Sequence, residues 1–212
     1  MNVQDWEQRI AHRTDISMGL VHLTKRDSKH SPLGILMKIL EEKTIKGSIN
    51  KIVNGHQQGF ICGNNPAVCF QDVPLHSLSE NILWEQQLHR QAPELPIRYS
   101  PFGLRFDKRY VFRNGGRPVI YEKTNVAKDF LPEDEYWRIV KLDLENDDEL
   151  IDWTHEREWR IKGDFHFDLS EVEILLSDQN SLKNFNQYCE KKNMENLLDE
   201  IKGIVVLKSL LF

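Results

Sequence analysis

Cysteines are few in this sequence and long hydrophobic runs are missing, and each shortage excludes a class of protein. The 212 residues contain three cysteines, Cys62, Cys69 and Cys189. An odd number without zinc-binding spacing argues against a disulfide framework or a metal site, so we expect free thiols in a reducing compartment. No apolar run approaches the roughly 20 residues that span a bilayer. The chain also begins without a basic and apolar leader, so we expect a cytoplasmic protein with no membrane partner.

Positive charge is also in short supply. The 28 Lys and Arg residues are outnumbered by 33 Asp and Glu residues, which gives a formal net charge of −5. Proteins that are held on duplex nucleic acid by phosphate contacts are usually more basic. The charge therefore excludes a wholly basic binding surface, although it leaves room for a local basic patch. No glycine-rich phosphate-binding loop is present either, because the sequence has neither GxGxxG nor P-loop spacing. The pair Gly115-Gly116 has the pattern of a hairpin turn.

Helical and strand patterns are mixed along the whole chain. Ser31 followed by Pro32 is typical of a helix start, and apolar residues at helical spacing continue to residue 43. Strands are predicted at residues 18–24, 67–70, 102–106, 117–122, 136–144, 158–161, 172–176 and 204–207. Further helices are predicted at 3–10, 75–90 and 145–154, and a helix or helix pair at 180–202. The order is not a regular βαβ repeat. We therefore predict a single α+β domain over residues 1–212, with a mixed, split β-sheet core and peripheral helices.

Two segments contain polar or aromatic residues that can contact a ligand. His22 and Thr24 share one face of the first predicted strand, where they can bind a ligand. The alternative is that His22 is an ordinary core histidine with its hydrogen bonds satisfied. Tyr99 lies in an aromatic and basic segment, Arg98 to Leu104, that enters a later strand. Such a segment is a reasonable place for ligand contact, and it is also how ordinary chains enter a strand.

The segment Glu156 to Arg160 contains two carboxylates at strand spacing. On a strand, Glu156, Glu158 and Arg160 share one face. Like charges on one face are unfavourable unless something uses them, and one carboxylate of such a pair can serve in acid–base catalysis. On this interpretation, Glu158 and Glu156 are the candidate catalytic residues. The alternative is a solvated edge strand with salt bridges.

Phe70 follows Cys69 at the end of a short apolar run. A cysteine beside an aromatic residue is usually part of the core, and this interpretation is favoured here. The alternative is that Phe70 presents its ring to a flat heterocycle.

Five short blocks together resemble bacterial abortive-infection proteins of the AbiGi type. The blocks are His22 to Thr24, Pro66 to Leu75, Tyr99 to Leu104, Gly116 to Tyr121 and Glu156 to Arg160. The family is assigned to toxin–antitoxin and phage-defence settings. The resemblance covers roughly residues 20–162, and it implies a role in one of these settings with a toxin or antitoxin as partner.

A more distant likeness is to ADP-ribosyltransferases of the His–Tyr–Glu type, including the DarT type. It implies an ADP-ribosyltransferase-like fold with NAD as substrate. Carried over, His22 holds a ribose hydroxyl, Phe70 or Tyr99 stacks on nicotinamide, and Glu158 is the catalytic glutamate. The chain departs from that pattern at the middle position, where Val68-Cys69-Phe70 contains no tyrosine.

The likeness implies one of two functions. The first is an NAD-dependent ADP-ribosyltransferase that modifies a protein or a nucleic acid, or an NAD glycohydrolase if water is the acceptor. The second is a catalytically inactive module of the same fold that binds a partner or acts as an antitoxin. The paired glutamates favour the first function, and the missing tyrosine favours the second.

Overall fold

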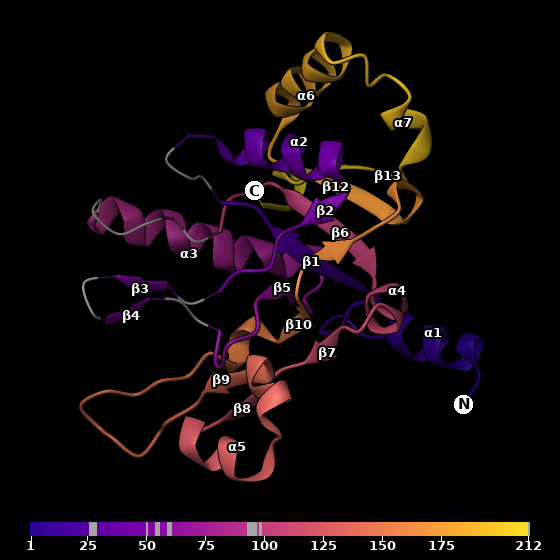
Figure 1. The fold of residues 1–212 in the computed structure, drawn as a ribbon. Coiled ribbons are helices and arrows are strands. Elements are labelled where there is room, and N and C mark those ends of the chain that lie inside the picture. Colours follow the sequence, from indigo (N-terminus) through magenta and orange to yellow (C-terminus); the bar gives the residue numbers. More distant parts are fainter. Residues whose placement is uncertain are drawn as a thin grey trace. The chain divides into compact units, whose positions relative to one another are not determined.

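Helices and strands alternate in the computed structural model, which describes residues 1–25, 29–49, 51–53, 56–58, 61–92, 97 and 99–211. The fold is α+β with mixed strand pairing, which confirms that part of the prediction: β12 runs parallel to β13, whereas β12 and β6 are antiparallel. Figure 1 labels the helices and strands. Contacts group the chain into two units. Unit 1 comprises residues 1–43, 73–108 and 167–212, and unit 2 comprises residues 44–72 and 109–166. The expectation of one domain stays a prediction.

Unit 1 contains a sheet in the order β13-β12-β6-β1. Its strands are β1 (Gly19–Leu23), β6 (Gly103–Asp107), β12 (Val172–Leu176) and β13 (Gly203–Val206). Its helices are α1 (Val3–Ala11), α2 (Pro32–Glu42), η1 (Leu75–Ser77), α3 (Leu78–Gln91), η4 (Leu169–Glu171), α6 (Gln179–Lys191), α7 (Leu197–Glu200) and α8 (Lys208–Leu211). Each of the strands and helices predicted in these segments is present, with ends shifted by a few residues.

The core of unit 1 lies between α3 and the sheet. Leu78 and Ile82 of α3 pack with Val21 of β1 and Leu175 of β12, and all four residues are fully buried. Burying apolar side chains of this size typically contributes about 1.5–3 kcal/mol each. The start of α2 follows the sequence signal, because the Ser31 hydroxyl accepts a hydrogen bond from the Gly34 N–H at 3.1 Å and Pro32 is the first helical residue.

Unit 2 contains several small strand pairings. Its strands are β2 (Thr44–Ile45), β3 (Lys51–Val53), β4 (His56–Gln58), β5 (Ala67–Gln71), β7 (Arg117–Pro118), β8 (Ile120–Glu122), β9 (Ile139–Lys141), β10 (Glu158–Lys162) and β11 (Phe165–His166). Its helices are α4 (Lys108–Arg113), whose first residue belongs to unit 1, α5 (Thr124–Phe130), η2 (Glu133–Arg138) and η3 (Thr154–Glu156). β10 pairs antiparallel with β5 and β7, and β8 pairs parallel with β9.

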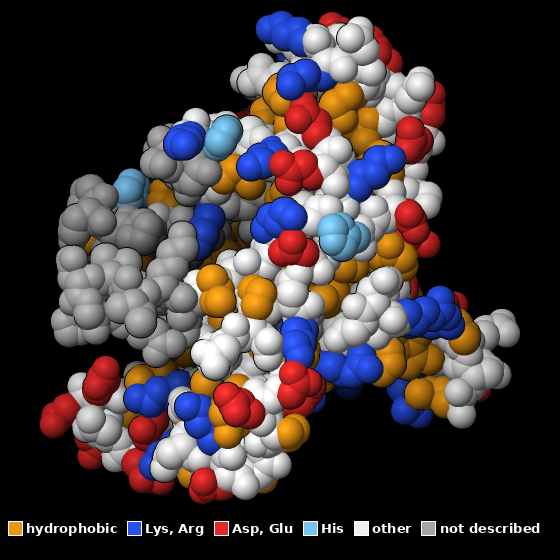
Figure 2. Space-filling view, in the orientation of Figure 1, with side chains coloured by type: hydrophobic (Ala, Val, Ile, Leu, Met, Phe, Trp, Pro, Cys, Tyr) orange, Lys and Arg blue, Asp and Glu red, His pale blue; other side chains and the backbone are white. Residues whose placement is uncertain are grey.

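Two sequence predictions in unit 2 are wrong. The charged stretch 145–154 was expected to be helical, but it is largely a loop closed by a bridge between Asp143 and Ile151. Acidic side chains gather on this loop after β9 (Figure 2). The predicted strand 136–144 is also shorter than expected, because residues 133–138 form the 3-10 helix η2.

Among the described helices, none combines the length and the apolarity needed to cross a membrane.

Candidate functional site

One face of the β5–β10 ladder in unit 2 bears a row of polar side chains. Gln71 lies opposite Glu158, and Cys69 lies opposite Arg160. Residues two apart on a strand share a face, and directly opposed residues on antiparallel strands are close neighbours. The four side chains therefore form one cluster, which we call the polar face of unit 2.

The Glu158 carboxylate is held by Arg160 through two hydrogen bonds. Nε of Arg160 lies 2.8 Å from Oε1 of Glu158, and Nη2 lies 3.0 Å from Oε2. Nη1 of Arg160 donates to the backbone oxygens of Trp137, at 2.7 Å, and Ile139, at 3.2 Å. Arg160 is only 1% exposed, whereas the Glu158 side chain is 15% exposed. Burial alone would lower the pKa of Arg160, but the charge of Glu158, the hydrogen bonds to it and the interaction with Cys69 together outweigh burial, and the pKa is raised.

Glu156 does not lie on the strand, so the prediction that it shares a strand face with Glu158 is wrong. It is the last residue of η3, and Arg157 after it adopts a left-handed backbone conformation with φ of 47°. This turn separates Glu156 from β10, which begins at Glu158. Glu156 is buried, and its Oε2 accepts a hydrogen bond of 2.6 Å from the side-chain amide of Gln71. The two carboxylates therefore meet different partners, a neutral amide for Glu156 and a guanidinium for Glu158.

Tyr121 of β8 also joins this site, although it was not among the predicted site residues and only closes the block Gly116 to Tyr121. Its hydroxyl oxygen accepts a hydrogen bond of 2.9 Å from the backbone N–H of Glu158. Burial raises the pKa of Tyr121 to about 12, and the charges of Glu158 and Glu156 act in the same direction. The thiol of Cys69 also has a raised pKa, because burial and then the charge of Glu158 disfavour the thiolate. Both groups are therefore neutral at physiological pH.

Phe70 lies on the opposite face of the ladder from Glu158. Its strand partner is Trp159, and its ring packs edge-on against Phe165 with the centroids 5.6 Å apart. The side chain is 1% exposed, so no ring face is open to a ligand. The structure therefore gives Phe70 a packing role, as the sequence alone favoured, and removes the basis for placing nicotinamide on this ring.

The other predicted site residues belong to unit 1. Thr24 is 2% exposed, and its hydroxyl lies 3.0 Å from the Pro32 carbonyl oxygen and 3.2 Å from that of Phe102. Its hydroxyl therefore donates to backbone carbonyl oxygens. His22 is partly exposed on β1, and Tyr99 packs against the core cluster under α3. Arg98, from the same segment as Tyr99, lies outside the described residues. That His22 and Tyr99 act together with Glu158 stays a prediction.

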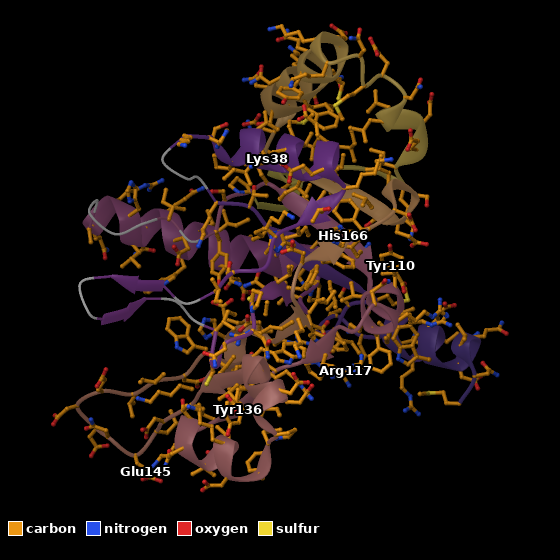
Figure 3. The ribbon with its side chains drawn as sticks, viewed as in Figure 1. Lys38, Tyr110, Arg117, Tyr136, Glu145 and His166 are labelled. Carbon is orange, nitrogen blue, oxygen red and sulfur yellow. The ribbon has the colours of Figure 1, made fainter. Side chains whose placement is uncertain are left out.

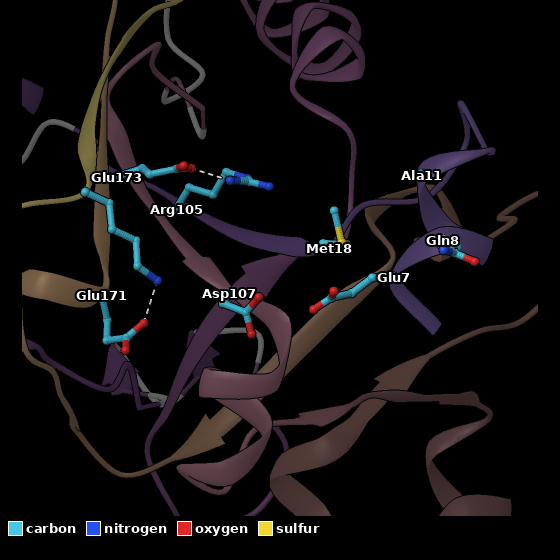
Figure 4. A pocket seen from close by; sticks show the side chains of 9 residues that line it. Glu7, Gln8, Ala11, Met18, Arg105, Asp107, Glu171 and Glu173 are labelled. Carbon is cyan, nitrogen blue, oxygen red and sulfur yellow. Dashed lines mark hydrogen bonds and ion pairs between the residues drawn. The ribbon is translucent and has the colours of Figure 1, made fainter. Parts of the chain in front are cut away.

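Unit 1 also contains a hollow of 480 Å³ between α1 and the sheet. Two ion pairs line it: Arg105 of β6 bonds to Glu173 of β12, and Lys202, just before β13, bonds to Glu171 of η4 (Figure 4). None of the six predicted site residues lines it. Its mixed, largely paired charges indicate no particular ligand.

Cys62, Cys69 and Cys189 are free thiols. Within the described ranges, no group of three or more His, Cys, Asp or Glu residues is arranged to hold a metal ion.

Comparison with known proteins returned no matching family model, no matching curated protein and no matching solved structure. The chemistry of the polar face is therefore inferred from its own residues.

Proposed function

We propose that this protein is an NAD-dependent ADP-ribosyltransferase, or an NAD glycohydrolase if water is the acceptor, that acts in phage defence or a toxin–antitoxin system. An ADP-ribosyltransferase-like fold is part of the proposal. The observation that supports it most directly is the fixed carboxylate of Glu158, which is 15% exposed and held by two hydrogen bonds from a buried guanidinium. The resemblance of the blocks around His22 and Glu158 to AbiGi-type proteins and to His–Tyr–Glu transferases points in the same direction.

The proposed reaction breaks the bond between nicotinamide and C1 of the adjoining ribose. Nicotinamide leaves with the bonding electron pair, and positive charge develops on the ribose as in glycoside cleavage. A carboxylate held beside that carbon stabilises the charge without having to reorganise. The acceptor then forms a new bond to C1 and gives up its proton. Glu156, the second carboxylate of the site, is available to take that proton.

The ion pair of Glu158 with Arg160 favours a second candidate function, a binding module without catalytic activity. The full positive charge of Arg160 offsets the negative charge that an oxocarbenium-like transition state needs. A protein with the same fold in which Arg160 offsets the charge of Glu158 would bind a partner, as an antitoxin or a sensor, without consuming NAD.

Transfer of a label from NAD distinguishes the two functions. The protein is incubated with a cell lysate and NAD labelled in the adenosine half, and labelled protein, labelled nucleic acid and free ADP-ribose are each quantified. A transferase labels a macromolecule, and a glycohydrolase releases labelled ADP-ribose. In parallel, phage survival is compared for cells expressing wild type and Glu158→Gln. Protection by both proteins with no labelled product from either would support the binding module and overturn the enzyme.

A further inference from the structure

Tyr121 reaches the site from a different part of unit 2 than the glutamates. β8 holds it in register with Val140 of β9, and its hydroxyl oxygen lies 2.9 Å from the Glu158 backbone nitrogen. The contact joins residues that are 37 positions apart in the sequence. Tyr121 therefore stands beside the first residue of β10, next to the proposed catalytic carboxylate.

The hydrogen-bonding capacity of Tyr121 is only half used. A phenol both accepts and donates, and within the described ranges its only hydrogen bond is the one that it accepts from Glu158. Because burial raises the pKa of Tyr121 to about 12, the O–H remains a donor at physiological pH. That donor has no acceptor among the described residues.

Gln71, in the same site, has a hydrogen-bond acceptor that no described residue uses. Its amide nitrogen donates to Glu156, but its carbonyl oxygen is buried and has no donor within the described part of the chain. Gln71 is only 6% exposed. Buried polar atoms without partners are rare in folded proteins, and they are often found where a side chain has a functional role. The phenolic O–H of Tyr121 and the carbonyl oxygen of Gln71 are therefore one donor and one acceptor that can contact a polar ligand.

We propose that Tyr121 contacts the substrate and that its O–H donates to a hydroxyl oxygen of the ribose held at Glu158. This inference rests on the proposed function. A vicinal diol fits the site because each hydroxyl both donates and accepts. One hydroxyl donates to the Glu158 carboxylate, and its neighbour accepts from Tyr121. The class of ligand that Tyr121 selects is thus a nucleotide with an intact ribose diol.

Paired changes in protein and ligand test this contact. Dissociation constants are measured by calorimetry for ADP-ribose and for an analogue that lacks both hydroxyls on the terminal ribose. Tyr121→Phe removes only the phenolic hydroxyl, and it is expected to weaken ADP-ribose binding about fivefold, the effect of one hydrogen bond. It should leave binding of the dideoxy analogue unchanged. Tyr136→Phe is the matched control, because that hydroxyl lies elsewhere in unit 2, 3.4 Å from the Lys128 carbonyl oxygen (Figure 3).

The outcomes separate this inference from the proposed function. Equal weakening for both ligands would mean that Tyr121 only supports the fold, and it would overturn the contact. Unchanged ADP-ribose binding in Tyr121→Phe would overturn it as well, while leaving the proposed function in place. If wild type binds neither ADP-ribose nor NAD, the proposed function fails, and the role of Tyr121 fails with it.

Discussion

At the scale of single residues, the surroundings of Glu156 and Glu158 decide what each carboxylate can do. Glu158 is oriented by the planar guanidinium of Arg160, which presents two parallel donors to it. Glu156 accepts a hydrogen bond of 2.6 Å from the amide of Gln71, and the imidazole of His155 lies 3.9 Å from its other carboxylate oxygen. An ion pair that fixes one carboxylate next to a second, differently bonded one is suited to electrostatic stabilisation by Glu158 and proton transfer by Glu156.

The buried partner of Glu158 makes a prediction about stability. Glu158→Gln removes the charge that balances Arg160, which is 1% exposed. Removing one member of a buried ion pair typically costs 3–5 kcal/mol, and because glutamine keeps one acceptor we expect the free energy of unfolding to fall by about 3 kcal/mol. Urea denaturation measures this change.

The double variant Glu158→Gln/Arg160→Gln is the control for this prediction. It removes both charges and keeps amide donors near the Trp137 and Ile139 carbonyl oxygens, so it should recover part of the lost stability. A single variant as stable as wild type would show that Arg160 does not depend on Glu158.

The phenol of Tyr121 makes a prediction about pH. Its pKa is raised from 10.0 to about 12 in the folded protein, so the folded state holds this proton more tightly than the unfolded chain does. The resulting stability is fully present below pH 10 and is lost as the pH rises from 10 towards 12. Thermal melting across this range should show a smaller fall in Tyr121→Phe than in wild type. Parallel curves for the two proteins would contradict the assigned shift.

At the scale of elements, local signals predicted α2 well and the stretch 145–154 badly. Ser31 and Pro32 act within their own helix, so sequence is enough to place its start. The later stretch is rich in Asp and Asn, whose side chains bond to nearby backbone: Asp143 accepts from the Glu145 N–H, and Asn146 accepts from that of Asp148. These local bonds compete with a helix.

The site shows the same division between local and distant signals. Period-two alternation correctly placed Glu158 and Arg160 on one face. It could not reveal the turn at Arg157 that takes Glu156 off the strand, nor the approach of Tyr121, which is 37 positions away from Glu158. Both depend on tertiary pairing, and no local pattern encodes them.

Two positions of α2 give opposite predictions for the same substitution. Lys43 caps the helix with φ of 47°, a left-handed conformation that favours glycine, whereas Lys38 lies inside the helix (Figure 3). Each lysine also forms one exposed ion pair at 3.8 Å, Lys43 with Glu200 and Lys38 with Glu42. We expect Lys43→Gly to raise the free energy of unfolding by about 0.5–1 kcal/mol and Lys38→Gly to lower it by about 1 kcal/mol. Chemical denaturation of both variants tests the pair, and a loss of stability in Lys43→Gly would refute the expectation.

At the scale of the whole molecule, the polar face is assembled entirely within unit 2. Its members come from both chain segments of that unit, Cys69 and Gln71 from residues 44–72 and Glu158 and Arg160 from residues 109–166, and Tyr121 also belongs to the second segment. The ion pair, the Gln71–Glu156 hydrogen bond and the Tyr121 contact are therefore all internal to one unit. Variants of these unit 2 residues therefore test the proposed chemistry of Glu158.

The release of free nicotinamide from NAD tests the central claim most directly. The 212-residue protein is incubated with NAD, and nicotinamide is quantified over time for wild type and for Glu158→Gln, at a temperature where both are folded. We expect wild type to release nicotinamide and Glu158→Gln to do so about 100- to 1000-fold more slowly, the usual cost of removing one preorganised stabilising group. Equal rates in the two proteins, or no release by wild type, would contradict the assignment of Glu158 as the catalytic carboxylate.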